Sequence, residues 1–260
     1  MNSSYEFRRA ITRKPGRSIV DGLRAEDIGK PDLARMLEAH AAYVATLRST
    51  GAEVVELPPL EDYPDAVFVE DTMLCLPELA IVMRPGAPSR MGEVAEMRPA
   101  IAGFYGDRIA EIIAPGTIEG GDILVTGREI LVGLSARTNR EGVAQLTDIV
   151  NEYGYTLRLV ETPEGVLHFK TDCGLLAPET ILSTRRLAVS GCFEGYEVLL
   201  VPDGEEAASN CIRFNNLVIM AAGFPRTAEM LAAHGYEVVQ IDNIECAKLD
   251  GGMSCLSLRF

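Results

Sequence analysis

The sequence carries little positive charge. Lys and Arg account for 24 of its 260 residues against 38 Asp and Glu, which leaves a formal net charge of −14 at pH 7. A protein that binds the phosphate backbone of nucleic acid needs the opposite balance, because its Lys and Arg side chains displace the counterions of that backbone. We therefore expect no nucleic-acid partner, and the acidic balance favours a cationic ligand.

Long hydrophobic runs and paired cysteines are also missing. No uncharged apolar stretch reaches the roughly 20 residues of a membrane span, and the charged N-terminus MNSSYEFRRAITRKPG is unlike a secretory signal. The six cysteines form no CxxC pair, which is typical of reduced thiols. These features predict a cytoplasmic protein without membrane contact. Because no Pro-, Gly- or Ser-rich linker divides the chain, we expect one domain over residues 1–260.

What the sequence does contain is a repeated helix–glycine–strand pattern. Apolar residues at helical spacing over residues 31–50 precede Gly51, an expected helix C-cap, and the strand-like segment AEVVEL. The same order recurs twice, at 143–153 with Gly154 and YTLRLV, and at 227–234 with Gly235 and YEVVQI. The pattern predicts alternating helices and strands, and hence an α/β fold.

Five further segments place a polar or acidic cluster beside an apolar strand. Their starts lie 51, 49, 42 and 41 residues apart: FVEDTMLCL (68–76), EGGDILVTG (119–127), HFKTDCGLL (168–176), NCIRFNNLVIM (210–220) and GGMSCLSLRF (251–260). Five β/α units at this period predict a closed circular array, with an ordinary doubly wound sheet as the alternative. In a circular array the polar clusters would meet at one central site.

Cys255 and His168 are the candidate catalytic residues. The two glycines of DGGMSC allow a tight turn that would expose the Cys255 thiol, whose thiolate form is a strong nucleophile. His168 lies in the strand-like segment VLHFKTD and would act as a general acid and base. We interpret His40 and His234 as structural or surface groups and the other cysteines as small buried hydrophobes. A Cys/His zinc site is disfavoured, because the spacing matches no zinc pattern.

Carboxylates and two arginines complete the candidate set. Carboxylates beside apolar strands are costly unless paired, and two of them would hold a planar guanidinium well. They are Asp65, Glu70 and Asp71 in PDAVFVEDT, and Glu119 and Asp122 in EGGD; capping of turns is the alternative interpretation. Arg90 and Arg137 lie in loop-like stretches, either to bind a substrate carboxylate or as ordinary surface residues. The set indicates cysteine-dependent chemistry on an arginine-like molecule.

The motifs that hold these residues resemble those of the dimethylarginine dimethylaminohydrolases, a family of the guanidino-group-modifying (amidinotransferase) superfamily. The resemblance runs nearly end to end, and its most specific segments are FVEDT, RPGAPSR and GLSARTN, with support from GVLHFKTDC and LDGGMSCLSL. It implies a five-bladed α/β propeller with a pseudo-five-fold repeat of ββαβ-type units. That fold agrees with the five-unit period of the sequence.

The same resemblance implies a role for each matching residue. Cys255 would be the nucleophile, His168 the proton donor and later the base, and Glu119 a carboxylate that orients His168. Asp71 and Glu119 would hold the substrate guanidinium, and the two arginines would suit its α-carboxylate. The implied substrate-binding residues are Leu23, Asp65, Glu70, Asp71, Arg90, Arg137 and Leu249.

The implied reaction is hydrolysis of asymmetric dimethylarginine or monomethylarginine to citrulline and dimethylamine or methylamine. It would pass through a covalent Cys255 thiouronium and need no metal or cofactor, although zinc would inhibit by capturing the thiolate. The nearest alternative, an arginine or agmatine deiminase, is disfavoured by the modest length and, for agmatine, by the two arginines. A non-catalytic binding protein on the same scaffold would not need Cys255, His168 and Glu119 together. The oligomeric state stays open, with a homodimer as one option.

Overall fold

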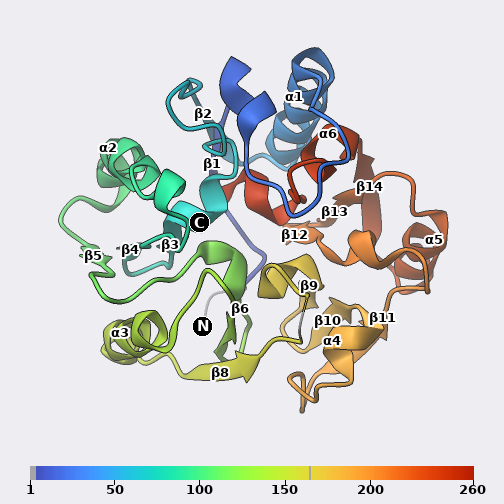
Figure 1. Cartoon of the computed structure of the whole chain (residues 1–260). Helices are drawn as coiled ribbons and strands as arrows, with labels where there is room; N and C mark the ends of the chain where they lie inside the picture. The colour runs from blue at the N-terminus through green and yellow to red at the C-terminus, as the bar shows by residue number, and fades with distance from the viewer. Residues whose placement is uncertain (1–3, 164) are drawn as a thin grey trace.

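Five three-stranded β-sheets surround a common centre, and the helices lie toward the outside of the ring (Figure 1). This computed structural model describes residues 4–163 and 165–260. The strands form five separate sheets, which excludes a single doubly wound sheet and fits the predicted five-fold repeat. The chain is therefore a mixed α/β fold built from repeated units.

Each unit has the order strand, strand, helix, strand. The units are β3 (Met73–Cys75), β4 (Ala80–Val82), α2 (Glu93–Tyr105) and β5 (Ile109–Glu111); β6 (Ile123–Val125), β7 (Ile130–Leu134), α3 (Arg140–Asn151) and β8 (Leu157–Glu161); β9 (Cys173–Ala177), β10 (Thr180–Ser183), α4 (Arg185–Ala188) and β11 (Glu197–Leu200); β12 (Ile212–Phe214), β13 (Leu217–Ala221), α5 (Pro225–Ala233) and β14 (Glu237–Ile241). The fifth unit joins the chain ends, with β15 (Leu258–Arg259) preceding β1 (Arg9–Arg13), α1 (Leu33–Ser49) and β2 (Glu53–Leu57) in the repeat.

The pairing of strands is the same in every sheet. The first strand of a unit runs antiparallel to the second, and the second runs parallel to the third. A parallel pair needs a long crossover connection, which the helix of each unit supplies. Because the C-terminal strand β15 pairs with β1, the last unit is completed only when the two ends of the chain meet.

Helix α1 shows how the sequence signals define an element. The side chain of Asp32 accepts a hydrogen bond from the Arg35 N–H at 3.0 Å and caps the N-terminus. Gly51 follows the last turn with a φ of +86°, the left-handed conformation that glycine adopts without strain. The buried face includes Met36, Tyr43 and Leu47, so the predicted helix and its C-terminal glycine are confirmed.

The polar clusters of the sequence become short 3₁₀ turns at the inner end of each unit. They are η2 (Val69–Thr72), η4 (Gly120–Asp122), η5 (Phe169–Thr171), η6 (Glu206–Ser209) and η7 (Ser254–Leu256), and each closely precedes the first strand of its unit. Neighbouring turns contact one another, η7 with η2, η2 with η4, η4 with η5 and η5 with η6. The sequence predicts that the clusters at 65–71, 119–122, 168–172 and 250–255 converge, and the contacts of η7 with η2, η2 with η4 and η4 with η5 confirm this.

The helix–glycine–strand pattern of the sequence did not predict two of the helices, α2 and α4. Helix α2 contains Pro99, which interrupts a helical interpretation, and α4 is a single four-residue turn. The remaining short elements are η1 (Arg17–Asp21), η3 (Pro88–Arg90) and α6 (Ile244–Ala247). Among the helices of residues 4–163 and 165–260, none is long and apolar enough to cross a membrane.

Candidate active site

A pocket of about 170 Å³ opens at the ring centre and brings together residues far apart in sequence. Eight of the ten predicted site residues line it: Leu23, Asp65, Asp71, Arg90, Arg137, His168, Leu249 and Cys255. Glu119 is fully buried and is reached through His168. Glu70 is the predicted residue that lies elsewhere.

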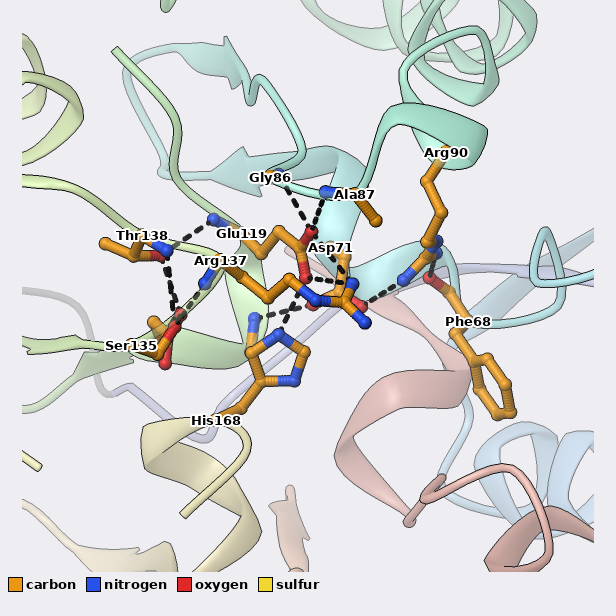
Figure 2. Close-up of polar contacts among 12 residues, drawn as sticks. Phe68, Asp71, Gly86, Ala87, Arg90, Glu119, Ser135, Arg137, Thr138 and His168 are labelled. Atoms are coloured by element: carbon orange, nitrogen blue, oxygen red, sulfur yellow. Dashed lines mark hydrogen bonds and ion pairs between the residues drawn. The ribbon is translucent and has the colours of Figure 1, made fainter. Parts of the chain in front are cut away.

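The imidazole of His168 is held by Glu119. Its Nε2 lies 2.7 Å from Glu119 Oε2, and the other carboxylate oxygen accepts hydrogen bonds from the N–H groups of Gly86 and Ala87 at 3.0 and 3.4 Å (Figure 2). The segment RPGAPSR therefore supplies backbone donors that fix the carboxylate. His168 itself caps the N-terminus of η5, so its predicted place in a strand is wrong. The inner turn, rather than a strand, points the ring at the pocket.

Three carboxylates determine the protonation of His168. Burial alone would lower its pKa, but Asp71, Asp122 and Glu119 together raise it to about 9. At neutral pH the ring is therefore protonated and can donate a proton. Asp122 does not face the substrate side, because its oxygens accept hydrogen bonds from the Ser135 and Thr138 hydroxyls and from the Phe169 N–H.

Asp71 is fixed by two donors of different kinds. Its Oδ2 lies 2.5 Å from Arg90 Nη1, and its Oδ1 accepts a hydrogen bond from the Gly121 N–H at 2.8 Å. Burial works against the charged form, yet the cations His168 and Arg90 lower the pKa of Asp71 to about 2. A Cβ at position 121 would lie 2.9 Å from both Asp71 and His168, so the second glycine of EGGD is required for space.

The two arginines differ in how they are used. Arg90 is buried, and each of its nitrogens already bonds a protein acceptor on Asp71, Glu93 or the backbone of residues 65 and 68. Arg137 keeps a side chain that is 19% exposed and places Nη1 3.3 and 3.4 Å from the oxygens of Glu119. Of the two, Arg137 has donors left over for a ligand in the pocket.

Cys255 is the half-buried thiol at the opposite wall. The residue with positive φ before it is Asp250, at 58°, and neither Gly251 nor Gly252 has a positive φ. They are needed for space instead, because a Cβ at Gly251 would lie 2.4 Å from Phe68. Burial, together with Glu70 and Asp71, raises the pKa of the Cys255 thiol to about 11. The thiol is therefore neutral at pH 7 with these neighbours.

Glu70 does not reach this pocket. Its Oε1 pairs with Lys170 Nζ at 2.5 Å and with the guanidinium of Arg259, and it lines a separate cavity of about 740 Å³. Glu70 is therefore not among the residues that line the pocket of Cys255 and His168, and its contact with substrate stays a prediction. The two neighbouring cations draw the side chain to the far side of η2, while Asp71, one residue on, faces the pocket.

The segment after η1 lines the pocket with the predicted Leu23 and with Arg24 and Ala25, which the sequence did not single out. The N–H of Leu23 donates to Asp65 Oδ1 at 2.9 Å, and the N–H of Ala25 donates to Asp250 Oδ2 at 2.6 Å. The segment after η1 is thereby tied to two sides of the pocket, which Phe68, Leu167 and Arg24 also line. Because these contacts use backbone atoms and apolar side chains, no residue-type signal would have indicated them.

Asp71, Glu119 and His168 also form a set of ligand atoms that lie within 4.8 Å of one another. Such a set could hold a metal ion. In this structure the guanidinium groups of Arg90 and Arg137 already bond the two carboxylates, and the raised pKa of His168 keeps its ring protonated at neutral pH. These three cations oppose a metal ion here, whereas the two carboxylates already bind planar guanidinium groups through hydrogen bonds.

Comparison with known proteins identifies the family. A family model described as arginine deiminase matches residues 89–161. A dimethylarginine dimethylaminohydrolase of Pseudomonas aeruginosa is 43% identical and covers 98% of this chain and 100% of its own length. The chain belongs to the dimethylarginine dimethylaminohydrolase family. A second member, from Streptomyces coelicolor, is 37% identical and covers 97% of this chain and 96% of its own.

Solved structures of the dimethylarginine dimethylaminohydrolase family agree in fold. The Pseudomonas aeruginosa enzyme, crystallised as a cysteine-to-serine mutant with citrulline, superimposes with a TM-score of 0.96 at 42% identity, over 98% of this chain and all of that one. The family membership expected from FVEDT, RPGAPSR and GLSARTN is confirmed. The match also extends over the five units and the short turns between them.

Proposed function

We propose that this chain hydrolyses Nω-methylated arginines, releasing citrulline and dimethylamine or methylamine. The observation that carries the proposal is the single pocket that Cys255 and His168 both line, with Asp71 in its wall and Glu119 bonded to His168. A thiol, a protonated imidazole and two buried carboxylates are the groups that amidine hydrolysis through a covalent intermediate requires. Family membership supports the same reaction.

The carboxylates give the pocket its preference for a cation. Asp71 and Glu119 would bind the substrate guanidinium, which would replace the contact between Arg137 Nη1 and Glu119. Arg137, released from Glu119, would bind the α-carboxylate as a fork of two N–H donors. We assign Arg90 the part of holding Asp71, and Asp65 with Leu23 and Leu249 the part of shaping the amino-acid end.

The reaction would proceed in two displacements. The Cys255 thiol loses its proton to solvent as the cationic substrate binds, and the thiolate attacks the guanidinium carbon. His168 protonates the leaving dimethylamine, so the C–N bond breaks and a positively charged thiouronium remains on Cys255. Neutral His168 then takes a proton from water and the hydroxide adds to the same carbon. The C–S bond breaks as the new hydroxyl loses its proton to solvent, which releases the thiolate and citrulline.

The same proposal extends to architecture and location. We propose that the five sheets are the blades of a closed α/β propeller that forms one domain over residues 1–260. The hydrogen bond from the Ser254 N–H to Asn210 Oδ1 at 3.0 Å supports closure, because it joins the inner turns at either side of the last unit boundary. Six free cysteines and the acidic composition favour a cytoplasmic location.

Citrulline release from dimethylarginine, arginine and agmatine, measured in parallel at equal concentration, tests the proposal. We expect the largest kcat/KM with dimethylarginine and the methylated amine as co-product. A preference for arginine or agmatine with ammonia release would instead establish a deiminase. No citrulline from any of the three, with intact fold, would favour a non-catalytic binding protein.

A further inference from the structure

Two polar side chains of the described residues lie close to the sulfur of Cys255, and the backbone of Gly252 is a further hydrogen-bonding neighbour. Asn210 Nδ2 lies 4.0 Å from Sγ, and Ser254 Oγ lies 3.9 Å from it. The nearby cations of the inner turns are already engaged, since Lys170 and Arg259 both pair with Glu70. Neutral donors can therefore add to whatever stabilisation His168 and a bound cationic substrate give to a thiolate here.

The side chain of Asn210 is held in a single orientation. It is 7% exposed, and its Oδ1 accepts a hydrogen bond from the Ser254 N–H at 3.0 Å. Because that backbone donor needs an acceptor, the oxygen faces Ser254 and the NH₂ group is left to face the sulfur. A Cβ at Gly252 would lie 2.3 to 2.6 Å from the side-chain amide atoms of Asn210. The glycine is therefore needed for the Asn210 amide to pack against the backbone before η7.

We propose that Asn210 is a further functional residue of this site: its carboxamide anchors the η7 turn through Oδ1 and donates an Nδ2–H to the thiolate of Cys255. The inference rests on the proposed function, because it assigns Asn210 to the nucleophile of that reaction. Asn210 belongs to the fourth polar cluster of the sequence, NCIRFNNLVIM, the one cluster to which neither the motifs nor the resemblance gave a residue role.

The physical reason is the charge that forms on sulfur. A thiolate beside Glu70 and Asp71 is disfavoured by both carboxylates and by burial. A hydrogen bond to the charged form favours that form, and a neutral amide donor does so without leaving a buried cation unpaired when the thiol is protonated. Asn210 thus raises the thiolate fraction without adding a charge to the pocket.

Alkylation of Cys255 by iodoacetamide tests this directly, because the reagent is uncharged and reacts with the thiolate. The rate at pH 8 is followed on the Cys255 peptide by mass spectrometry, without substrate, in the unmodified chain and in Asn210→Leu. Leu has nearly the shape of Asn, carries no donor and keeps water out. A hydrogen bond to a charged group is typically worth a factor of roughly 10 to 100, so we expect alkylation to slow by that factor.

Asn210→Ala is the second variant. The matched control is Asn216→Ala, which changes an exposed asparagine of the same segment, 210–220. In Asn210→Ala, water enters the space and donates in place of the amide, so the expected rate lies between those of the unmodified chain and Asn210→Leu. Asn216→Ala should leave the rate unchanged. The alkylation rate is interpreted for the Asn210 variant whose melting temperature lies within a few degrees of that of the unmodified chain, because that variant is folded.

Rates within twofold of the unmodified chain in a folded Asn210 variant would overturn the proposal. The outcome is separable from that of the proposed function, because alkylation involves neither methylarginine nor citrulline. If the unmodified chain releases no citrulline but Asn210→Leu still slows alkylation, the amide–sulfur contact stands and the assigned reaction fails. If citrulline is released and alkylation is unaffected, the reaction stands and the role of Asn210 fails.

Discussion

The two halves of the pocket are built from the same repeated turn but from different chemistry. Turns η2, η4 and η5 bring Asp71, Glu119 and His168, all buried and all held by charged or backbone partners. Turn η7 brings Cys255 and Asn210 follows η6, and the side chains that lie within 4.0 Å of the Cys255 sulfur, those of Asn210 and Ser254, are neutral. We call the first set the charged half and the second the thiol half.

The difference follows from the cost of burying charge. An ionised group in the interior must be paired, so every member of the charged half has fixed partners before substrate arrives. A protonated thiol is neutral and can be buried with weak partners, which leaves its ionisation to be decided when the cation binds. The repeat thus provides the same backbone turn in each unit. The type of residue on that turn determines whether the side chain is ionised before the substrate binds or only when it binds.

The largest effect is expected from the thiol half. Cys255→Ser should abolish citrulline release while the protein stays folded, because a serine hydroxyl at this position has no base strong enough to ionise it. Turnover is measured by the citrulline assay beside a thermal melt. Cys75→Ser, which changes the other half-buried cysteine, is the control and should keep activity. Substantial turnover by folded Cys255→Ser would remove the covalent mechanism.

The next effect tests the charged half. His168→Ala should lower kcat by about 10²–10⁴-fold, since the amine must then leave without a proton from the protein. Added imidazole should restore part of the rate, whereas the exposed His234→Ala should behave as the unmodified chain. A rate for His168→Ala within a few fold of normal would show that the proton comes from elsewhere.

A smaller effect is expected where the charged half meets the amino-acid end of the substrate. Arg137→Ala should lower kcat/KM for dimethylarginine roughly 10–100-fold more than for its decarboxylated analogue, because a hydrogen-bonded ion pair is lost. Arg137→Lys should recover only part, since it offers a point charge instead of a fork. Equal losses for both substrates with a lower melting temperature would mean that Arg137 merely orders the GLSARTN loop.

The smallest effect concerns stability. The pKa of His168 is raised from 6.5 to about 9 in the folded chain, so its protonated form stabilises the fold. This contribution is fully present below about pH 6.5 and is lost as the pH rises toward 9, at no more than about 1.4 kcal/mol per pH unit. Denaturant unfolding between pH 6 and 9 should show this loss in the unmodified chain and in His234→Gln. A profile for His168→Gln that falls just as steeply would rule out His168 as its source.

Much of this molecule was accessible from the sequence by itself. Helical spacing ended by Gly51, Gly154 and Gly235 predicted three helices and the strands after them, because such periodicity and left-handed glycines are local properties of the chain. The five polar clusters predicted the repeat. The motifs around Cys255 and His168 indicated both the chemistry and the family.

Tertiary structure alone decided which side chains face the pocket. Glu70 and Asp71 are adjacent in sequence and equal in type, yet Lys170 and Arg259, 100 and 189 residues away, hold Glu70 in the other cavity. Arg90 and Arg137 look alike as loop arginines, but Asp71 and Glu93 occupy one while the other stays partly free. The sequence determines which groups are available and where the backbone turns. Which charges are paired, and so which remain for a ligand, depends on contacts between units that exist only once the ring has formed.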